Sequence, residues 1–83
     1  MEVRERYTAT VVAVNATVTV NSNMIGGFLC KTSGTVTAID ANGNTIVNAF
    51  PVTAGTYFPM PFFMGSVGGS FIAAGGASGT LAN

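Results

Sequence analysis

The chain has 83 residues, with three basic and three acidic side chains, no histidine and one cysteine. This composition excludes a His-dependent catalytic triad, a zinc site built from His and Cys, and a disulfide within the chain. Three cations are too few to neutralise a tract of phosphates, so nucleic acid is not an expected partner. The composition favours a protein that is not an enzyme and has no metal or cofactor.

Low charge and small size together predict self-association. A chain of this length forms one domain and buries only about 60 to 65% of the surface that its unfolded form exposes. Charged residues make up 7% of the chain, against roughly 25% in typical soluble domains, so little keeps a free monomer soluble. We therefore expect a homo-oligomer, stabilised by contacts between subunits.

The first six residues hold four of the six charges. We divide the chain into a charged N-terminal arm, residues 1–6, and a single β domain, residues 7–83. The arm is a candidate for contacts with a partner through Glu2, Arg4, Glu5 and Arg6. The alternative is a solvated, frayed terminus. No secretory signal is visible, and the charge-free run 7–30 has too many Thr and Asn residues for a membrane helix, so we expect synthesis in the cytoplasm and no membrane partner.

The first half of the domain has the pattern of β-strands. Thr, Val, Ile, Phe and Tyr dominate, and apolar residues alternate with a period of two rather than recurring at helical spacing. We expect a first strand from Tyr7 to Val20 with a possible break at Asn15, and a turn at residues 21–23. The next two strands are expected at 24–31 and 35–40.

Asn42 and Gly43 predict a tight hairpin turn, because both central residues of a type I′ turn need positive φ. Pairing Ala41 with Asn44 sets the register of the strands on either side. The expected pairs are Ile39 with Ile46, Ala38 with Val47, Thr37 with Asn48 and Val36 with Ala49. One face of the hairpin then carries Val36, Ala38, Val47 and Ala49, and the other carries Ile39, Ile46 and Phe50.

The segment from Tyr57 to Met64 is the main candidate for a contact surface. Pro59 and Pro61 exclude a central strand there, and Pro51 marks the end or the edge of the preceding strand. Aromatic residues and Met are enriched in interface cores, and their consecutive placement makes both sides of the strand apolar. The candidate interface residues are Tyr57, Phe58, Met60, Phe62, Phe63 and Met64. The alternative is that they complete the domain's own core; Phe62→Ser separates the two, since an interface residue affects assembly more than the fold.

Glycine clusters punctuate the end of the chain. A faint echo links Gly26–Val36 with Gly68–Leu81, and two similar hairpins or low complexity alone would explain it. The run 75–80 lacks the Lys and the following helix of a phosphate-binding loop, so its glycines indicate turns. Cys30 has no neighbouring base and fits a small buried side chain. About seven short strands in all predict an all-β domain, a small antiparallel β-sandwich or jelly-roll-like barrel.

The motifs of residues 26–82 resemble small structural proteins of tailed bacteriophages. They include G-T-V-T at 34–37, N-G-N-T-I-V at 42–47, P-V-T-A-G-T-Y at 51–57 and P-F-F at 61–63. In particular, the chain is similar to capsid decoration or cement proteins. The resemblance implies a structural protein on the surface of the virion, a homo-oligomer that is a trimer or a dimer, with a trimer favoured, bound to the major capsid protein. The alternative is a carbohydrate- or receptor-binding module of a phage tail fibre or spike, in which exposed aromatic residues would stack on sugar rings.

Overall fold

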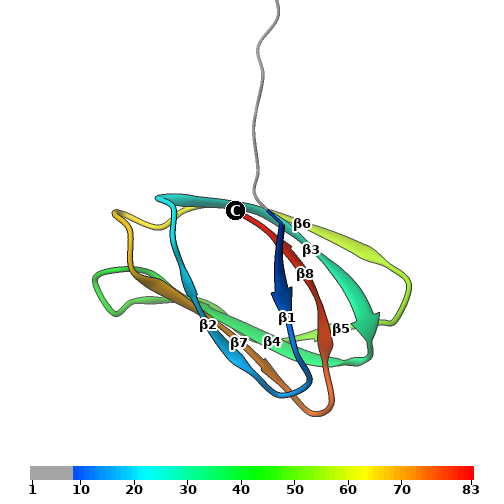
Figure 1. The fold of residues 1–83 in the computed structure, drawn as a ribbon. Helices are drawn as coiled ribbons and strands as arrows, with labels where there is room; N and C mark the ends of the chain where they lie inside the picture. Colours follow the sequence, from blue (N-terminus) through cyan, green and yellow to red (C-terminus); the bar gives the residue numbers. More distant parts are fainter. Residues whose placement is uncertain (1–8) are drawn as a thin grey trace, which may run out of the picture.

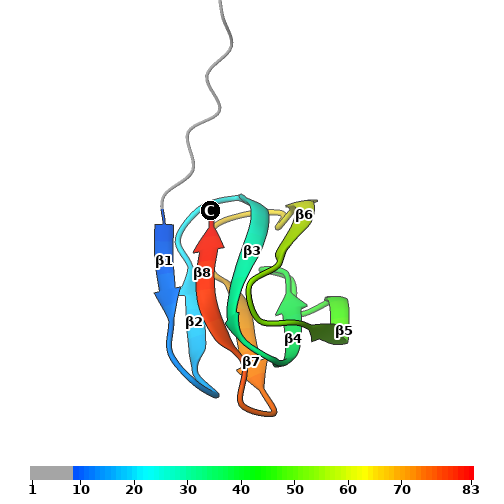
Figure 2. The ribbon, with the colours of Figure 1, turned by 90° about the vertical axis from the view of Figure 1, so that its right-hand side faces the viewer.

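The computed structural model describes residues 9–83 and is a sandwich of two four-stranded antiparallel sheets (Figures 1 and 2). The eight strands are β1 (Ala9–Val12), β2 (Thr17–Val20), β3 (Met24–Thr32), β4 (Gly34–Ile39), β5 (Thr45–Val52), β6 (Tyr57–Phe63), β7 (Gly69–Ala74) and β8 (Ser78–Ala82). We call the sheet ordered β1-β8-β3-β6 sheet I and the sheet ordered β2-β7-β4-β5 sheet II. The predicted all-β sandwich is confirmed.

The strand pairs are nested around the middle of the chain. β4 pairs with β5, β3 with β6, β2 with β7 and β1 with β8. A long hairpin rolled up in this way is the arrangement of a jelly roll. There are eight strands rather than about seven because the expected first strand is interrupted by a turn at residues 13–16. Asn15 has φ 56° there, a conformation that Asn tolerates better than most residues.

The β4–β5 hairpin forms where Asn42 and Gly43 predicted it, but with a different turn. The Asn44 carbonyl accepts a hydrogen bond from the Asp40 N–H, and the Asp40 carbonyl accepts one from the Gly43 N–H. Only Gly43 has positive φ, at 86°. This is a three-residue loop with glycine in the left-handed position, and not the expected two-residue turn. The Asp40 carboxylate supports it by accepting hydrogen bonds from the backbone N–H groups of Asn42 and Asn44.

The predicted register of this hairpin is correct for Ala38 and Val47 but wrong on either side. Ile39 pairs with Thr45 rather than Ile46, and Val36 pairs with Phe50 rather than Ala49. The strand bulges at Ala49, which has φ 48° and donates its N–H to the Thr37 hydroxyl. A bulge places one extra residue on one strand, so the side chains beyond it change faces.

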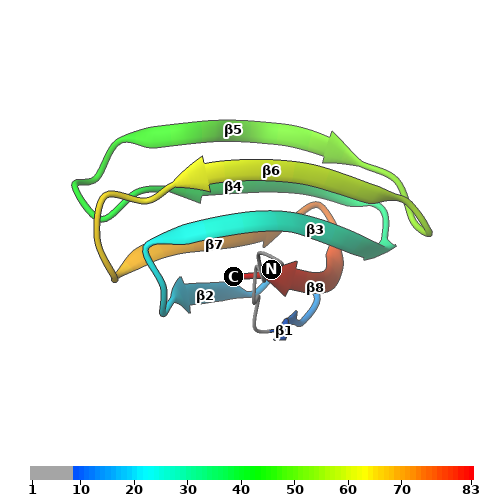
Figure 3. The same cartoon turned by 90° about the horizontal axis from the view of Figure 1, so that it is seen from above.

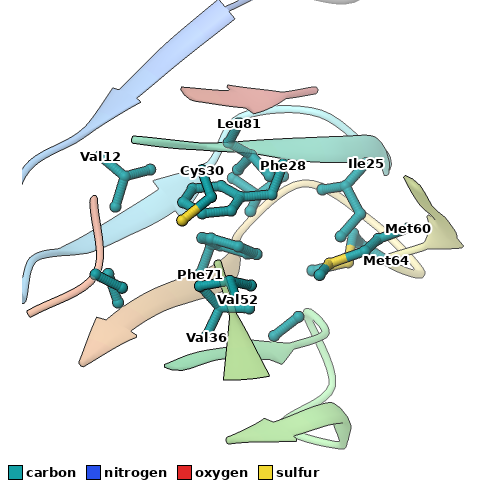
Figure 4. Close-up of a cluster of buried hydrophobic side chains, with 14 residues drawn as sticks. Val12, Ile25, Phe28, Cys30, Val36, Val52, Met60, Met64, Phe71 and Leu81 are labelled. Carbon is teal, nitrogen blue, oxygen red and sulfur yellow. The ribbon is translucent and has the colours of Figure 1, made fainter. Parts of the chain in front are cut away.

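The core lies between the sheets, where Phe28 of sheet I and Phe71 of sheet II meet with ring centroids 5.1 Å apart (Figure 4). These two residues are the centres of the sequence echo, yet the segments that carry them are not hairpins. β3 and β4 belong to different sheets, as do β7 and β8. The shared Ser/Thr and Gly residues mark two corners at which the chain passes from one sheet to the other.

The edges of the sandwich carry the prolines. Seen from above, β5 and β6 lie together on one side, while β1 and β2 lie on the other (Figure 3). Pro51 is in β5, and Pro59 and Pro61 are in β6, so the predictions for these three prolines are confirmed. Proline on an edge strand removes N–H donors that would otherwise invite another strand to pair.

Candidate interaction surface

The outer face of sheet I carries a row of side chains that crosses all four strands. Val11 pairs with Thr80, Thr80 with Leu29, and Leu29 with Tyr57. Directly paired residues lie on the same face of a sheet, so the four side chains are neighbours. Val11 is 76% exposed, and Leu29 and Tyr57 are about half exposed, at 50% and 51%. The solvent-exposed face of a sheet normally carries polar side chains, whereas this face exposes large apolar side chains.

Smaller residues form the next row. Ala9 pairs with Ala82, Ala82 with Gly27, and Gly27 with Pro59. The Tyr57 ring lies over Gly27, so closely that a methyl group at Gly27 would overlap it, and its hydroxyl donates to the Gly26 carbonyl at 3.4 Å. Gly27 is buried as a result, although no strand covers it. The ring therefore covers the backbone at Gly27 and fills part of this row.

Together these rows form one surface, which we call the apolar face. Five of the eight large apolar side chains that are exposed in residues 9–83 belong to it. Lys31, at the end of β3, borders it and is the one charged residue on this side of sheet I among residues 9–83. The members of the apolar face are Ala9, Val11, Met24, Leu29, Tyr57, Pro59, Pro61, Phe63, Thr80 and Ala82.

A second apolar feature lies between the edge strands β5 and β6. It is a hollow of about 230 Å³ lined by Val47, Phe50, Phe58, Pro59, Met60 and Phe62. Phe50 and Phe58 form an edge-to-face pair at its wall, with ring centroids 5.8 Å apart. The predicted register had placed Phe50 on the face of Ile39 and Ile46, but beyond the bulge at Ala49 it pairs with Val36 and lines this hollow.

The structure divides the six interface residues predicted in and after β6 among three environments. Met60 and Met64 are core residues, 4% and 0% exposed, and Met60 also lines the hollow between β5 and β6. Phe58 and Phe62 are half-buried against the core, and Tyr57 and Phe63 are exposed on the apolar face. The alternation of burial along β6 explains the division, since successive side chains point to opposite faces.

Sequence reasoning missed the part of the apolar face that lies outside β6. Val11 and Leu29 lie far from β6 in the sequence, and only the pairing of β1, β8, β3 and β6 brings them beside Tyr57. The runs Phe28–Cys30 and Thr10–Val12 contained a local signal, because apolar residues on both sides of a strand indicate that both faces of the sheet are covered. The predicted arm residues Glu2, Arg4, Glu5 and Arg6 lie outside the described residues.

The reactive and polar groups of residues 9–83 serve the fold. Cys30 is 2% exposed, as expected for a small buried side chain, and burial raises the pKa of its thiol. Hydrogen bonds from the Asn44 and Asn42 backbone lower the pKa of Asp40. No group of three or more potential metal ligands occurs within this range, and the same range holds no helix of the length and hydropathy needed to span a membrane.

The comparisons with known proteins add no relative to this description. No protein-family model and no curated protein matches the sequence, and no solved structure matches the fold.

Proposed function

We propose that this protein is a non-enzymatic structural subunit that acts by binding other protein surfaces, as a decoration or cement subunit of a bacteriophage capsid. The observation that carries the proposal is the apolar face, which turns Val11, Leu29, Tyr57 and Phe63 to solvent from strands of one sheet. Large contiguous apolar patches on small soluble domains mark interaction sites. The resemblance of residues 26–82 to decoration proteins supplies the kind of assembly.

The fold supports this role without specifying it. Jelly rolls are common in viral capsid proteins, but they also occur in lectins and enzymes, so the argument depends on the surface and not on the topology. Described residues 9–83 carry two charged side chains, Lys31 and Asp40, and neither has a second titratable group with which to carry out acid-base chemistry. A surface with so few charged groups suits binding through complementary shape and burial of apolar area better than it suits catalysis. Repetition over a shell would multiply a modest contact into strong attachment.

Binding to capsid shells tests the proposal directly. Shells are assembled from the major capsid protein encoded in the same genome, mixed with the purified chain and sedimented. We expect the chain to pellet with the shells at a fixed ratio and to remain in the supernatant without them. A chain that ignores the shells at micromolar concentration contradicts the capsid role. A glycan array run in parallel addresses the tail-fibre alternative, which predicts saccharide binding that Tyr57→Ala abolishes.

A further inference from the structure

We infer that the apolar face is covered by a second copy of this chain, packed sheet I against sheet I around a two-fold axis. The inference rests on the proposed structural role and specifies its first step, the pairing of subunits before any shell is bound. Three observations support it: the distribution of polarity over the four sheet faces, the size of the apolar face and its lack of charge.

The four sheet faces differ in a way that suits a four-layer pair. Sheet I is apolar on both sides, with Phe28 on its inner face and Leu29 on its outer face. Sheet II is apolar inside and turns Thr17, Thr19, Thr35 and Thr37 outward, with Ile39 and Ile72 half-buried among them. A pair stacked in the order II-I-I-II would enclose every apolar face and leave only the threonine-rich faces in water.

The area is sufficient for a stable dimer. Val11, Met24, Leu29, Tyr57 and Phe63 are all more than a third exposed. Aromatic side chains carry about 150 to 250 Å² each and aliphatic ones somewhat less, so these five expose on the order of 500 Å². Two copies would therefore bury about 1,000 Å² from these side chains alone, which is the lower bound for a specific interface, and the Ala, Pro and Thr residues between them add to it.

The charge and relief of the face favour a copy of itself as the occupant. Among described residues 9–83, a partner of opposite charge would find only Lys31 on this side of sheet I, at the end of β3. The central pair, Leu29 and Thr80, is uncharged, and Lys31 lines a surface hollow with Thr80 and Val11, so the axis must keep the two Lys31 side chains apart. Rows of large and small residues alternate along the strands, and a two-fold axis places the ridge of one copy against the shallower row of the other.

Leu29→Lys tests the pairing, with Thr19→Lys on the outer face of sheet II as its matched control. Both side chains are exposed, so both variants should keep the thermal midpoint that wild type has at a concentration too low for pairing. A two-fold interface contains the substitution twice, so we expect Leu29→Lys to raise the dimer dissociation constant about 100-fold or more, as measured by sedimentation velocity. Thr19→Lys should leave the dimer unchanged. The inference is overturned if the wild-type chain stays monomeric or forms a trimer. It is also overturned if the Leu29→Lys variant dimerises as tightly as wild type.

A cross-linking experiment locates the axis. Packed sheets lie about 10 Å apart, so a short bis-maleimide can join two copies of Thr80→Cys across the centre of the face. Ser70→Cys on sheet II is the control for position, and the wild-type chain shows whether the buried Cys30 reacts with the cross-linker. We expect a covalent dimer only from Thr80→Cys, and the absence of this dimer contradicts the proposed geometry.

Shell binding separates the two proposals. A wild-type monomer that still pellets with capsids refutes the pairing and keeps the structural role. A dimer that does not bind capsids keeps the pairing and refutes the capsid role.

Discussion

The two sheets of this protein share an inner layer but differ in what they turn outward. The centre of the outer face of sheet II is the row Thr17, Ile72 and Thr37, whereas the equivalent row of sheet I is Val11, Thr80, Leu29 and Tyr57. Threonine keeps the β preference of a branched side chain and still binds water through its hydroxyl. In a chain almost without charge, threonine is thus the main way to make a sheet face soluble. The outer face of sheet II has threonines on both sides of Ile72, whereas the row of sheet I has Thr80 alone among large apolar side chains.

Truncation of the inner layer gives the largest expected effect and sets the scale for the comparison. Phe28 and Phe71 are both fully buried and contact each other across the two sheets. We expect Phe28→Ala and Phe71→Ala to lower the free energy of unfolding by about 3 to 5 kcal/mol each, from lost burial and an unfilled cavity. Urea unfolding measures both. If only one of the two variants loses stability, the two sheets do not contribute equally to the core.

Gly79→Ala tests the tight packing inside sheet I. A methyl group there would overlap the Leu29 carbonyl and approach the Phe28 ring within 2.7 Å. Because backbone cannot move aside cheaply, we expect a loss of about 3 kcal/mol. Gly43→Ala is the control: its φ is +86° but the space around it is open, so left-handed strain alone should cost about 1 kcal/mol. Equal losses in thermal or urea unfolding would mean that β8 is not held against β3 as closely as described.

Substitutions of two neighbouring phenylalanines in β6 distinguish effects on stability from effects on self-association. Phe62 is half-buried against the core and lines the hollow, while Phe63 is 65% exposed on the apolar face. We expect Phe62→Ser to cost about 2 kcal/mol of stability through lost burial. Phe63→Ser should change stability by less than about 0.5 kcal/mol and weaken self-association instead. This reverses the role that the sequence predicted for Phe62, and the opposite result in unfolding and sedimentation would restore it.

The smallest expected effect is a pH dependence of the β4–β5 turn. Hydrogen bonds lower the folded-state pKa of Asp40, so the ionised carboxylate stabilises the turn above the pKa of the unfolded chain, about 3.9. That contribution is lost as pH falls through the lowered folded-state pKa. The thermal midpoint of wild type should therefore decrease slightly more on acidification than that of Asp40→Asn. Asp40 lies in a turn of sheet II, so an equally large acid effect on self-association would contradict the assignment of the interface to sheet I.

Local features of the sequence account for the strands and for most of the turns. Alternation of Thr and Val predicted β2, Asn15 predicted the break before it, and the prolines placed β5 and β6 at sheet edges. These features depend on φ preferences, missing N–H groups and the two-residue period of a strand, all of which act within a few residues. The all-β class and the sandwich follow from them.

Tertiary structure decided the pairing of strands and, with it, the surface. β1 joins β8 from the opposite end of the chain, and only that contact, with β3 and β6, makes Val11 a neighbour of Leu29 and Tyr57. The bulge at Ala49 likewise depends on the Thr37 hydroxyl of the paired strand, and it turned Phe50 toward the hollow. Strand pairing over long separations reflects how all the apolar faces are buried together, and no local pattern contains that information.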